Sequence, residues 1–311
     1  MSERPILLQA DHLKKWFPVR KGVFSKAAQY VKAVDDVSLV IREGETLGIV
    51  GESGCGKSTL ARTMMRLIEP TEGTVLFQGQ DLTSADKESL RRMRRDIQII
   101  FQDPYASLNP RQRVSDILAE PFLIHKLGSR EAAMKRAEEL LDLVGLSQDS
   151  MRKFPHEFSG GQRQRVGIAQ ALLGDPAFLL FDEPTVGLDP EERIHFRNLF
   201  SQKAQDRLVL LSTHIIEDVQ SVCGQLVVMN HGSILFTGTP EQLIQSAAGH
   251  VGVFWEQEAV RDPGLHITAR VNTGQGIRCR AVADTRPAGA QPAEPTLEDA
   301  YLYFISREAA Q

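Results

Sequence analysis

The chain has 311 residues, 42% of them hydrophobic and 24% charged, which is typical of an ordinary globular protein with one large domain and a small appendage. Its formal net charge of -4 provides no general attraction to nucleic acid or anionic lipid, and no apolar run approaches the ~18 residues of a membrane-spanning helix. The N-terminus lacks a secretory signal pattern, and the cysteines at positions 55, 223 and 279 fit neither a metal site nor a disulfide set, so a reduced cytosolic compartment is expected.

Short apolar runs in the first part of the chain predict β-strands. These strands are Val37–Ile41, Thr46–Val50, Val75–Gln78 and Ile97–Phe101. Helical signals then dominate from about 113 to 157, including an amphipathic helix at 131–146. Strands return at Phe178–Phe181, Leu208–Ser212, Leu226–Met229 and Ser233–Phe236, the first two as buried parallel strands. The helical segment is therefore inserted between two strand-bearing parts.

The end of the chain differs in composition from the rest. Residues 281–295 are rich in Ala and Pro and predict a linker. Thr296 is expected to cap a short final helix. We therefore divide the chain into a core of about 1–240 and a C-terminal appendage of about 241–311.

A glycine-rich stretch at 51–59 fits the pattern G-x-x-x-x-G-K-S/T of a phosphate-binding loop. It follows a predicted strand and opens a predicted helix, where backbone N–H groups and the helix N-terminus can converge on phosphate oxygens. Lys57 is expected to bridge the β- and γ-phosphates of a nucleoside triphosphate, and the Ser58 hydroxyl to bind Mg²⁺. The predicted nucleotide-binding residues here are Gly51, Glu52, Ser53, Gly54, Cys55, Gly56, Lys57, Ser58 and Thr59. The helix N-terminus also predicts a reactive Cys55 thiolate.

Four residues at the ends of predicted strands complete a candidate hydrolytic site. Asp182 can hold a water of Mg²⁺, and Glu183 can orient or deprotonate the attacking water. The Gln102 amide can ligate Mg²⁺, and His214 can contact the γ-phosphate. Alone, Gln102 and His214 are also typical of surface or structural positions; the neighbouring motifs favour function. The expected catalytic residues are Lys57, Gln102, Glu183 and His214, and the expected metal ligands are Ser58, Gln102 and Asp182.

A third motif, Ser159–Gln162, precedes a predicted helix from Arg163 to Leu173. Serine is a good helix cap, and two glycines let the backbone approach a phosphate. The three motifs cannot all serve one nucleotide within one monomer, so they predict a dimeric ATPase.

Together, the motifs at 51–59, 159–162 and 179–183 resemble those of the ATP-binding cassette (ABC) ATPase family, over nearly the whole chain. The resemblance implies an α/β fold, a P-loop NTPase with a RecA-like core, an antiparallel β subdomain and an inserted helical subdomain at about 103–158. It implies ATP and Mg²⁺ as cofactors. Two cassettes would pair head to tail, each ATP lying between the 51–59 loop of one and Ser159, Gly160, Gly161 and Gln162 of the other.

The resemblance also assigns two further positions. Asp189 belongs to a dimer-contacting loop after Glu183. Phe17 is the expected aromatic that stacks on adenine, with Trp16 and Tyr30 as alternatives. Core packing is the competing interpretation for all three rings.

Different stretches of the chain resemble two different subfamilies of these ATPases. Three stretches are similar to ATPases of dipeptide, oligopeptide and nickel importers: Val31–Asp35, Phe101–Pro110 and Pro155–Arg165. Three later stretches are similar to ATPases of multidrug or ABC-2 type exporters: Phe181–Pro190, Ser212–Val219 and Pro295–Leu302. Because the family contacts its membrane subunits through about 101–158, peptide or nickel-type import is favoured over export, and a soluble ABC ATPase outside transport is a remote third alternative.

The resemblance implies partners at the cytoplasmic face of the inner membrane. These are integral membrane permease subunits, a second ABC ATPase subunit, identical or different, and, for an importer, a solute-binding protein. Nucleic acid is not expected, because the basic run 91–95 is more typical of a solvated helix end.

Overall fold

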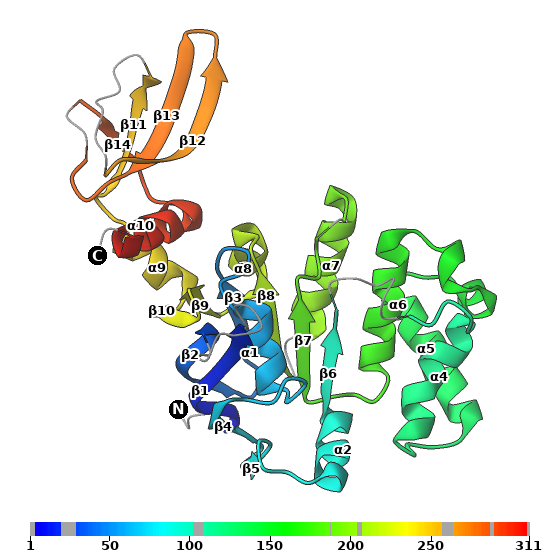
Figure 1. Ribbon diagram of the computed structural model, residues 1–311. Coiled ribbons are helices and arrows are strands. Elements are labelled where there is room, and N and C mark those ends of the chain that lie inside the picture. The colour runs from blue at the N-terminus through cyan, green and yellow to red at the C-terminus, as the bar shows by residue number, and fades with distance from the viewer. Residues whose placement is uncertain are drawn as a thin grey trace.

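The computed structural model describes residues 4–19, 29–101, 108–186, 188–203, 207–256, 264–286 and 289–309. Three β-sheets and their helices form this part of the protein (Figure 1). None of the described helices combines the length and the apolar character that crossing a membrane requires.

The central sheet has six strands in the order β10-β9-β3-β8-β7-β6, and only β10 pairs antiparallel. The strands are β3 (Thr46–Val50), β6 (Ile97–Ile100), β7 (Phe178–Asp182), β8 (Leu208–Thr213), β9 (Gln225–Asn230) and β10 (Ser233–Gly238). Alternate residues of β7 and β8 point into two different apolar clusters, one on each face of the sheet. Burial on both faces explains their continuous apolar sequences. The predicted buried parallel pair is confirmed.

Helices cover this sheet and connect its strands. They are α1 (Lys57–Met64), α2 (Lys87–Asp96), α7 (Pro190–Lys203), α8 (Ile216–Val222) and α9 (Pro240–Ser246). A second, antiparallel sheet has the order β2-β1-β4-β5, with β1 (Ile6–Val19), β2 (Gln29–Arg42), β4 (Glu72–Phe77) and β5 (Gln80–Asp81). This sheet shares an apolar cluster with α1, so it fixes the helix that opens at Lys57. The predicted α/β fold with an antiparallel β subdomain is confirmed.

The inserted helical segment lies at the right in Figure 1, beside the β6 edge. It contains α4 (Val114–Ile124), α5 (Arg130–Leu143), the short 3₁₀ turns Gln148–Arg152 and Pro155–Glu157, and α6 (Gly160–Leu172). Helix α5 begins after Ser129, whose Oγ accepts a hydrogen bond from Ala132 N at 3.2 Å. It ends before Gly145, whose φ of 69° favours glycine. The predicted helix at 131–146 is thus confirmed, slightly shorter.

The last part of the chain forms a third sheet and a helix. The sheet has the order β12-β13-β11-β14, with β11 (Val251–Trp255), β12 (His266–Thr273), β13 (Gly276–Val282) and β14 (Gln291–Pro292). Helix α10 (Leu297–Ala309) packs against this sheet and against α8 and α9 (Figure 1). The linker expected at 281–295 is wrong at both ends, because β13 includes Ala281 and β14 pairs with β11. The proposed division near residue 240 stays a prediction.

A buried carboxylate joins α10 to its sheet. Asp299 accepts hydrogen bonds from Thr268 of β12 at 2.6 Å and from Arg280 of β13 at 2.6 and 2.8 Å. Thr296 caps the helix as predicted: its Oγ1 accepts a bond from Asp299 N and donates one to the Asp299 carboxylate. Burial alone would raise the pKa of Asp299, but hydrogen bonds from Arg280, Thr268 and Thr296 outweigh it and lower the pKa.

Asp299→Ala is expected to lower the free energy of unfolding by about 3 kcal/mol, because it leaves the Arg280 guanidinium without its carboxylate. Since the folded-state pKa of Asp299 is lowered, its contribution is present above the unfolded value of about 3.9 and is lost as the pH falls through the folded pKa. Urea unfolding at pH 7 and below pH 4 measures both effects. Asp142→Ala, at an exposed carboxylate of α5, is the control. Equal losses in the two variants would contradict the expected role.

Candidate nucleotide site

The predicted phosphate loop connects β3 to α1. Gly54 and Gly56 have φ of 84° and 111°, a region that side chains rarely adopt. A Cβ on Gly56 would also lie 2.0 Å from the backbone oxygen of Ala33 in β2. Glycine is therefore required at 56 both for the turn and for the close approach of β2, which closes one side of the loop.

The loop borders a cavity of about 340 Å³, and residues far apart in the sequence complete its walls. The lining residues are Ala33, Ser53, Gly54, Gly56, Lys57, Ser58, Thr59, Glu183 and His214. The structure therefore brings Glu183 and His214, which follow β7 and β8, to the phosphate loop. This agrees with the arrangement of parallel strands, whose carboxyl ends meet at one edge of the sheet.

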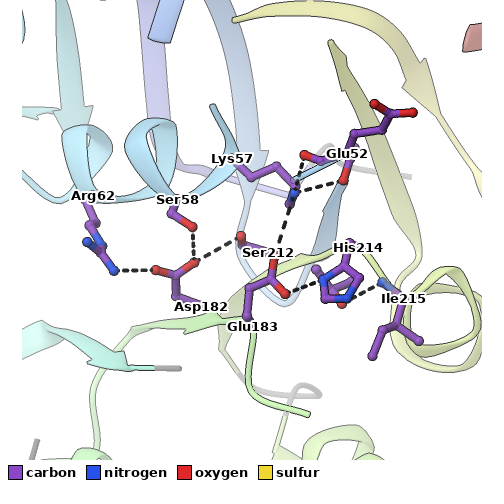
Figure 2. Close-up of polar contacts among 11 residues, drawn as sticks. Glu52, Lys57, Ser58, Arg62, Asp182, Glu183, Ser212, His214 and Ile215 are labelled. Carbon is purple, nitrogen blue, oxygen red and sulfur yellow. Dashed lines mark hydrogen bonds and ion pairs between the residues drawn. The ribbon is translucent and has the colours of Figure 1, made fainter. Parts of the chain in front are cut away.

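Lys57 lies at the first position of α1 and is only 4% exposed. Its Nζ donates hydrogen bonds to the backbone oxygens of Gly51 at 2.8 Å and Glu52 at 3.0 Å, and lies 3.7 Å from Glu183 Oε1 (Figure 2). The loop thus folds around a buried ammonium group. An anion entering the cavity would meet this charge beside the positive end of α1.

Asp182 is fixed by three donors at the end of β7. Its Oδ1 accepts hydrogen bonds from Ser58 Oγ at 2.7 Å and Ser212 Oγ at 3.2 Å, while its Oδ2 accepts one from Arg62 at 3.0 Å (Figure 2). Asp182 is 1% exposed. The Ser58 hydroxyl, which lines the cavity, thus adjoins a buried carboxylate oxygen, and oxygen donors of this kind are those that Mg²⁺ prefers when phosphates supply further ligands. The residues present fit the expected metal.

Glu183 and His214 form a pair. Glu183 Oε2 lies 2.5 Å from His214 Nδ1, within hydrogen-bond distance. The side chain of Glu183 is almost fully buried, whereas that of His214 is 49% exposed. The Glu183 backbone has φ of 53°, which points its side chain away from that of Asp182 and toward the cavity (Figure 2). A carboxylate held beside a phosphate loop in this way can accept a proton from water.

The Ser159–Gln162 motif lies elsewhere. Ser159 Oγ accepts a bond from Gln162 N at 3.2 Å, and Gln162 Oε1 accepts one from Ser159 N at 3.0 Å, so the predicted serine cap is confirmed. In Figure 1, α6 lies beyond β7 and β6 from α1. Within one chain this motif is therefore remote from the phosphate loop. Asp189 caps α7 by accepting a bond from Glu192 N at 2.8 Å.

The described residues do not place two of the expected groups at the cavity. Gln102 lies outside the described residues. None of the three aromatic candidates belongs to the described cavity lining: Trp16 donates to Asp35 Oδ1 at 3.1 Å, and Phe17 and Tyr30 are 38% and 54% exposed. Which ring contacts adenine stays a prediction.

The predicted thiolate at Cys55 is wrong. Burial raises the pKa of Cys55, and the nearby Lys57, which acts in the opposite direction, does not compensate. The thiol is 6% exposed and faces Gly51, so it fills space behind the loop. A helix N-terminus lowers the pKa of a thiol, whereas burial in apolar surroundings raises it.

Sequence reasoning missed two partners of Asp182. Arg62 lies four residues after Ser58 and therefore on the same face of α1, a spacing that could have identified it. Ser212, the last residue but one of β8, lies directly beside Asp182 in the parallel register. The sequence showed that Ser212 belongs to the stretch Ser212–His214, but it gave no sign that Ser212 contacts Asp182.

Comparisons with known proteins agree with this geometry. A family model described as ABC transporter matches residues 34–186. The chain is 44% identical to the oligopeptide transport ATP-binding protein AppF of Bacillus subtilis, over 77% of this chain and 74% of that protein. It is 42% identical to the dipeptide transport ATP-binding protein DppF of Escherichia coli, over 77% of this chain and 72% of that protein.

Solved structures show the same likeness. The dimeric post-hydrolysis state of the ATP-binding cassette MJ0796, bound to ADP and Pi, matches with a TM-score of 0.68 at 28% identity, over 75% of this chain and 98% of that chain. The structure of cbiO1 from Clostridium perfringens, part of an ABC transporter complex, matches with a TM-score of 0.65 at 26% identity, over 77% of this chain and 91% of that chain.

Proposed function

The chain belongs to the ABC transporter family as an ATP-hydrolysing subunit, and on that premise we propose that it powers the import of peptides across a membrane. The observation that carries the proposal is the convergence of Lys57, Glu183 and His214 on one cavity beside a phosphate loop, where Asp182 accepts a hydrogen bond from the lining residue Ser58. Relatives at 41–44% identity named for dipeptide or oligopeptide transport support peptides as the cargo.

The proposed roles follow from position. Lys57 binds the β- and γ-phosphates of ATP, because its ammonium is the cation at the loop. Ser58, Asp182 and Gln102 would hold Mg²⁺, which neutralises phosphate charge when bound. Glu183 accepts the proton of the water that attacks the γ-phosphorus, as ADP leaves. His214 contacts the γ-phosphate and fixes the Glu183 carboxylate from its other side.

A second cassette completes each site in this proposal. Ser159–Gln162 of one chain would contact the phosphates held by residues 51–59 of the other, which explains why the two motifs lie apart in one chain. The dimeric cassette among the solved relatives supports this assembly. The second cassette is either a copy of this chain or a related subunit.

The proposed membrane partner is a permease that contacts the helical segment. Beside β6, a cavity of about 200 Å³ is lined by Gln98, Ile99, Ile100, Phe101, Pro121, Gln164, Gly167, Gln170 and Ala171. Gln164 is 4% exposed, and its Nε2 has no hydrogen-bond partner among the described residues. An amide that lacks a partner beside apolar side chains suits a docked polypeptide with a free carbonyl. Because relatives of this chain are named as transport ATP-binding proteins, we also place the subunit at the cytoplasmic face of the cell membrane.

A pull-down tests the transport assignment. Tagged Glu183→Gln protein with MgATP, incubated with detergent-solubilised native membranes, is expected to retain permease subunits, a second cassette and a solute-binding protein. Omission of ATP controls for non-specific capture. Recovery of one polytopic protein type without a binding protein would contradict import and support the alternative of an ABC-2 type exporter.

A further inference from the structure

We propose that Asp218 is a positioning residue for ATP hydrolysis, which fixes the loop after Glu183, the helix after His214 and helix α7 to one another. The proposal rests on the catalytic roles proposed above and adds a residue that contacts neither Glu183 nor His214 directly. Its basis is a group formed by the buried residues Thr185 and Asp218 and the half-buried Arg197, here called the anchor cluster.

The anchor cluster holds the Asp218 carboxylate in one orientation. Thr185 Oγ1 donates to Asp218 Oδ2 at 2.5 Å, while Arg197 Nε and Nη2 donate to Oδ1 at 2.9 and 2.6 Å. Asp218 is 1% exposed and Thr185 is fully buried. Because each carboxylate oxygen has its own donor, and the buried charge is paired with a guanidinium, the side chain has little freedom to rotate.

Thr185 determines how the cluster acts on Glu183. The backbone φ of Glu183 is 53°, which is unfavourable for a residue with a side chain and persists only where the surroundings impose it. On one side, Glu183 N donates to Ser212 O at 2.8 Å. On the other, Thr185 is tied to Asp218. Release of Thr185 would remove a restraint on the backbone two residues after Glu183, which acts in addition to the contacts of Glu183 with His214 and Lys57.

The other two members of the cluster lead to further parts of the proposed site. Asp218 lies in the first turn of α8, a helix that begins two residues after His214. The N-terminus of a helix favours a negative charge such as that of Asp218. Arg197 lies on α7, whose N-terminus is capped by Asp189, the residue expected at the dimer contact. A displacement of α7 when two cassettes meet would thus be transmitted through Arg197 and Asp218 to Glu183 and His214.

Apolar packing holds α7 independently of this ion pair. The ring of Phe181 in β7 lies 5.5 Å from that of Phe196 and 5.0 Å from that of Phe200, measured between ring centroids. Conservative changes at Arg197 or Thr185 are therefore expected to leave the helix in place. They alter the orientation of the cluster rather than the fold.

Steady-state kinetics of Thr185→Val and Arg197→Lys test the inference. Valine replaces the hydroxyl with a methyl group of similar size, and lysine keeps the charge but not the two-nitrogen fork that holds Oδ1. Both variants are expected to lower kcat by about 10- to 100-fold, since a small misplacement of a catalytic group has effects of that order. Affinity for a fluorescent ATP analogue should stay unchanged, because Lys57 and its loop lie outside the cluster.

Two matched variants separate positioning from general stability. Thr185→Ser keeps the hydroxyl and should restore kcat. Arg136→Lys, in an exposed ion pair on α5, controls for the arginine change. A lower Tm with unchanged kcat in Thr185→Val and Arg197→Lys would show a purely structural cluster and overturn the inference. Glu183→Gln separates the two proposals: if it hydrolyses ATP normally the proposed site fails, whereas if it is inactive while both cluster variants keep their kcat, only the positioning role fails.

Discussion

Glu183→Gln is expected to bind ATP and lose most of its turnover. Glutamine keeps the shape of the side chain and its contact with His214, but it cannot accept a proton from water. Because a positioned general base contributes about 10²- to 10⁴-fold to a rate, kcat should fall by that factor. The uncharged side chain also removes the negative group 3.7 Å from Lys57, which should not weaken binding of a polyanion. Phosphate release and binding of a fluorescent ATP analogue measure the two properties.

Glu217→Gln is the matched control for this result. Glu217 lies on α8, three residues after His214, and is exposed to solvent. It should retain the parent turnover. Hydrolysis by Glu183→Gln within a few-fold of the parent would refute the base assignment, and loss of binding together with turnover would show instead that Glu183 maintains the loop.

Lys57→Ala is expected to lose nucleotide affinity. The variant removes the cation of Lys57, a residue that is 4% exposed, from the phosphate loop. Hydrogen bonds from a charged donor to phosphate are worth about 2–3 kcal/mol, which is equivalent to a change of roughly 30- to 150-fold in Kd. The affinity for AMP should differ less between parent and variant than the affinity for ATP, because AMP lacks the β- and γ-phosphates that Lys57 is expected to contact. Titration with fluorescent analogues of both nucleotides checks this. Lys135→Ala, at an exposed lysine of α5, is the control for the loss of a positive charge. Unchanged ATP affinity in Lys57→Ala would contradict the assignment of Lys57 to the phosphates.

The phosphate loop and the central strands were predictable because their signals are local. A loop such as 51–59 needs glycines at fixed spacing, and strands buried on both faces need continuous apolar runs. Asp182 and Glu183 followed from their position at the end of such a run. Their chemistry could be inferred before any tertiary contact was known.

Contacts between distant segments could not be predicted in this way. The pairs Arg62–Asp182 and Arg197–Asp218 join residues 120 and 21 positions apart, and no local pattern records which charges meet. The linker was expected at 281–295 because strand β14 has only two residues, within a stretch whose Ala and Pro content resembles a linker. The longer strands β11, β12 and β13 of the same sheet were not predicted either. Cys55 shows a further limit, since the loop pattern fixes its neighbours in sequence but not whether its sulfur faces solvent.

The packing of α10 also bears on how the protein is made. Tyr301 of this helix shares an apolar cluster with Val50, the residue before the phosphate loop. Burial, with smaller contributions from Glu52 and Cys55, raises the pKa of Tyr301 to about 12. The N-terminus of a chain emerges from the ribosome first, and domains tend to fold as they emerge. Val50 is synthesised about 250 residues before Tyr301. The packing of α10 behind the phosphate loop must therefore await translation of α10. The face of this cluster that α10 covers therefore stays uncovered until α10 has been translated, and a nascent chain stalled before α10 would expose those apolar side chains to chaperones.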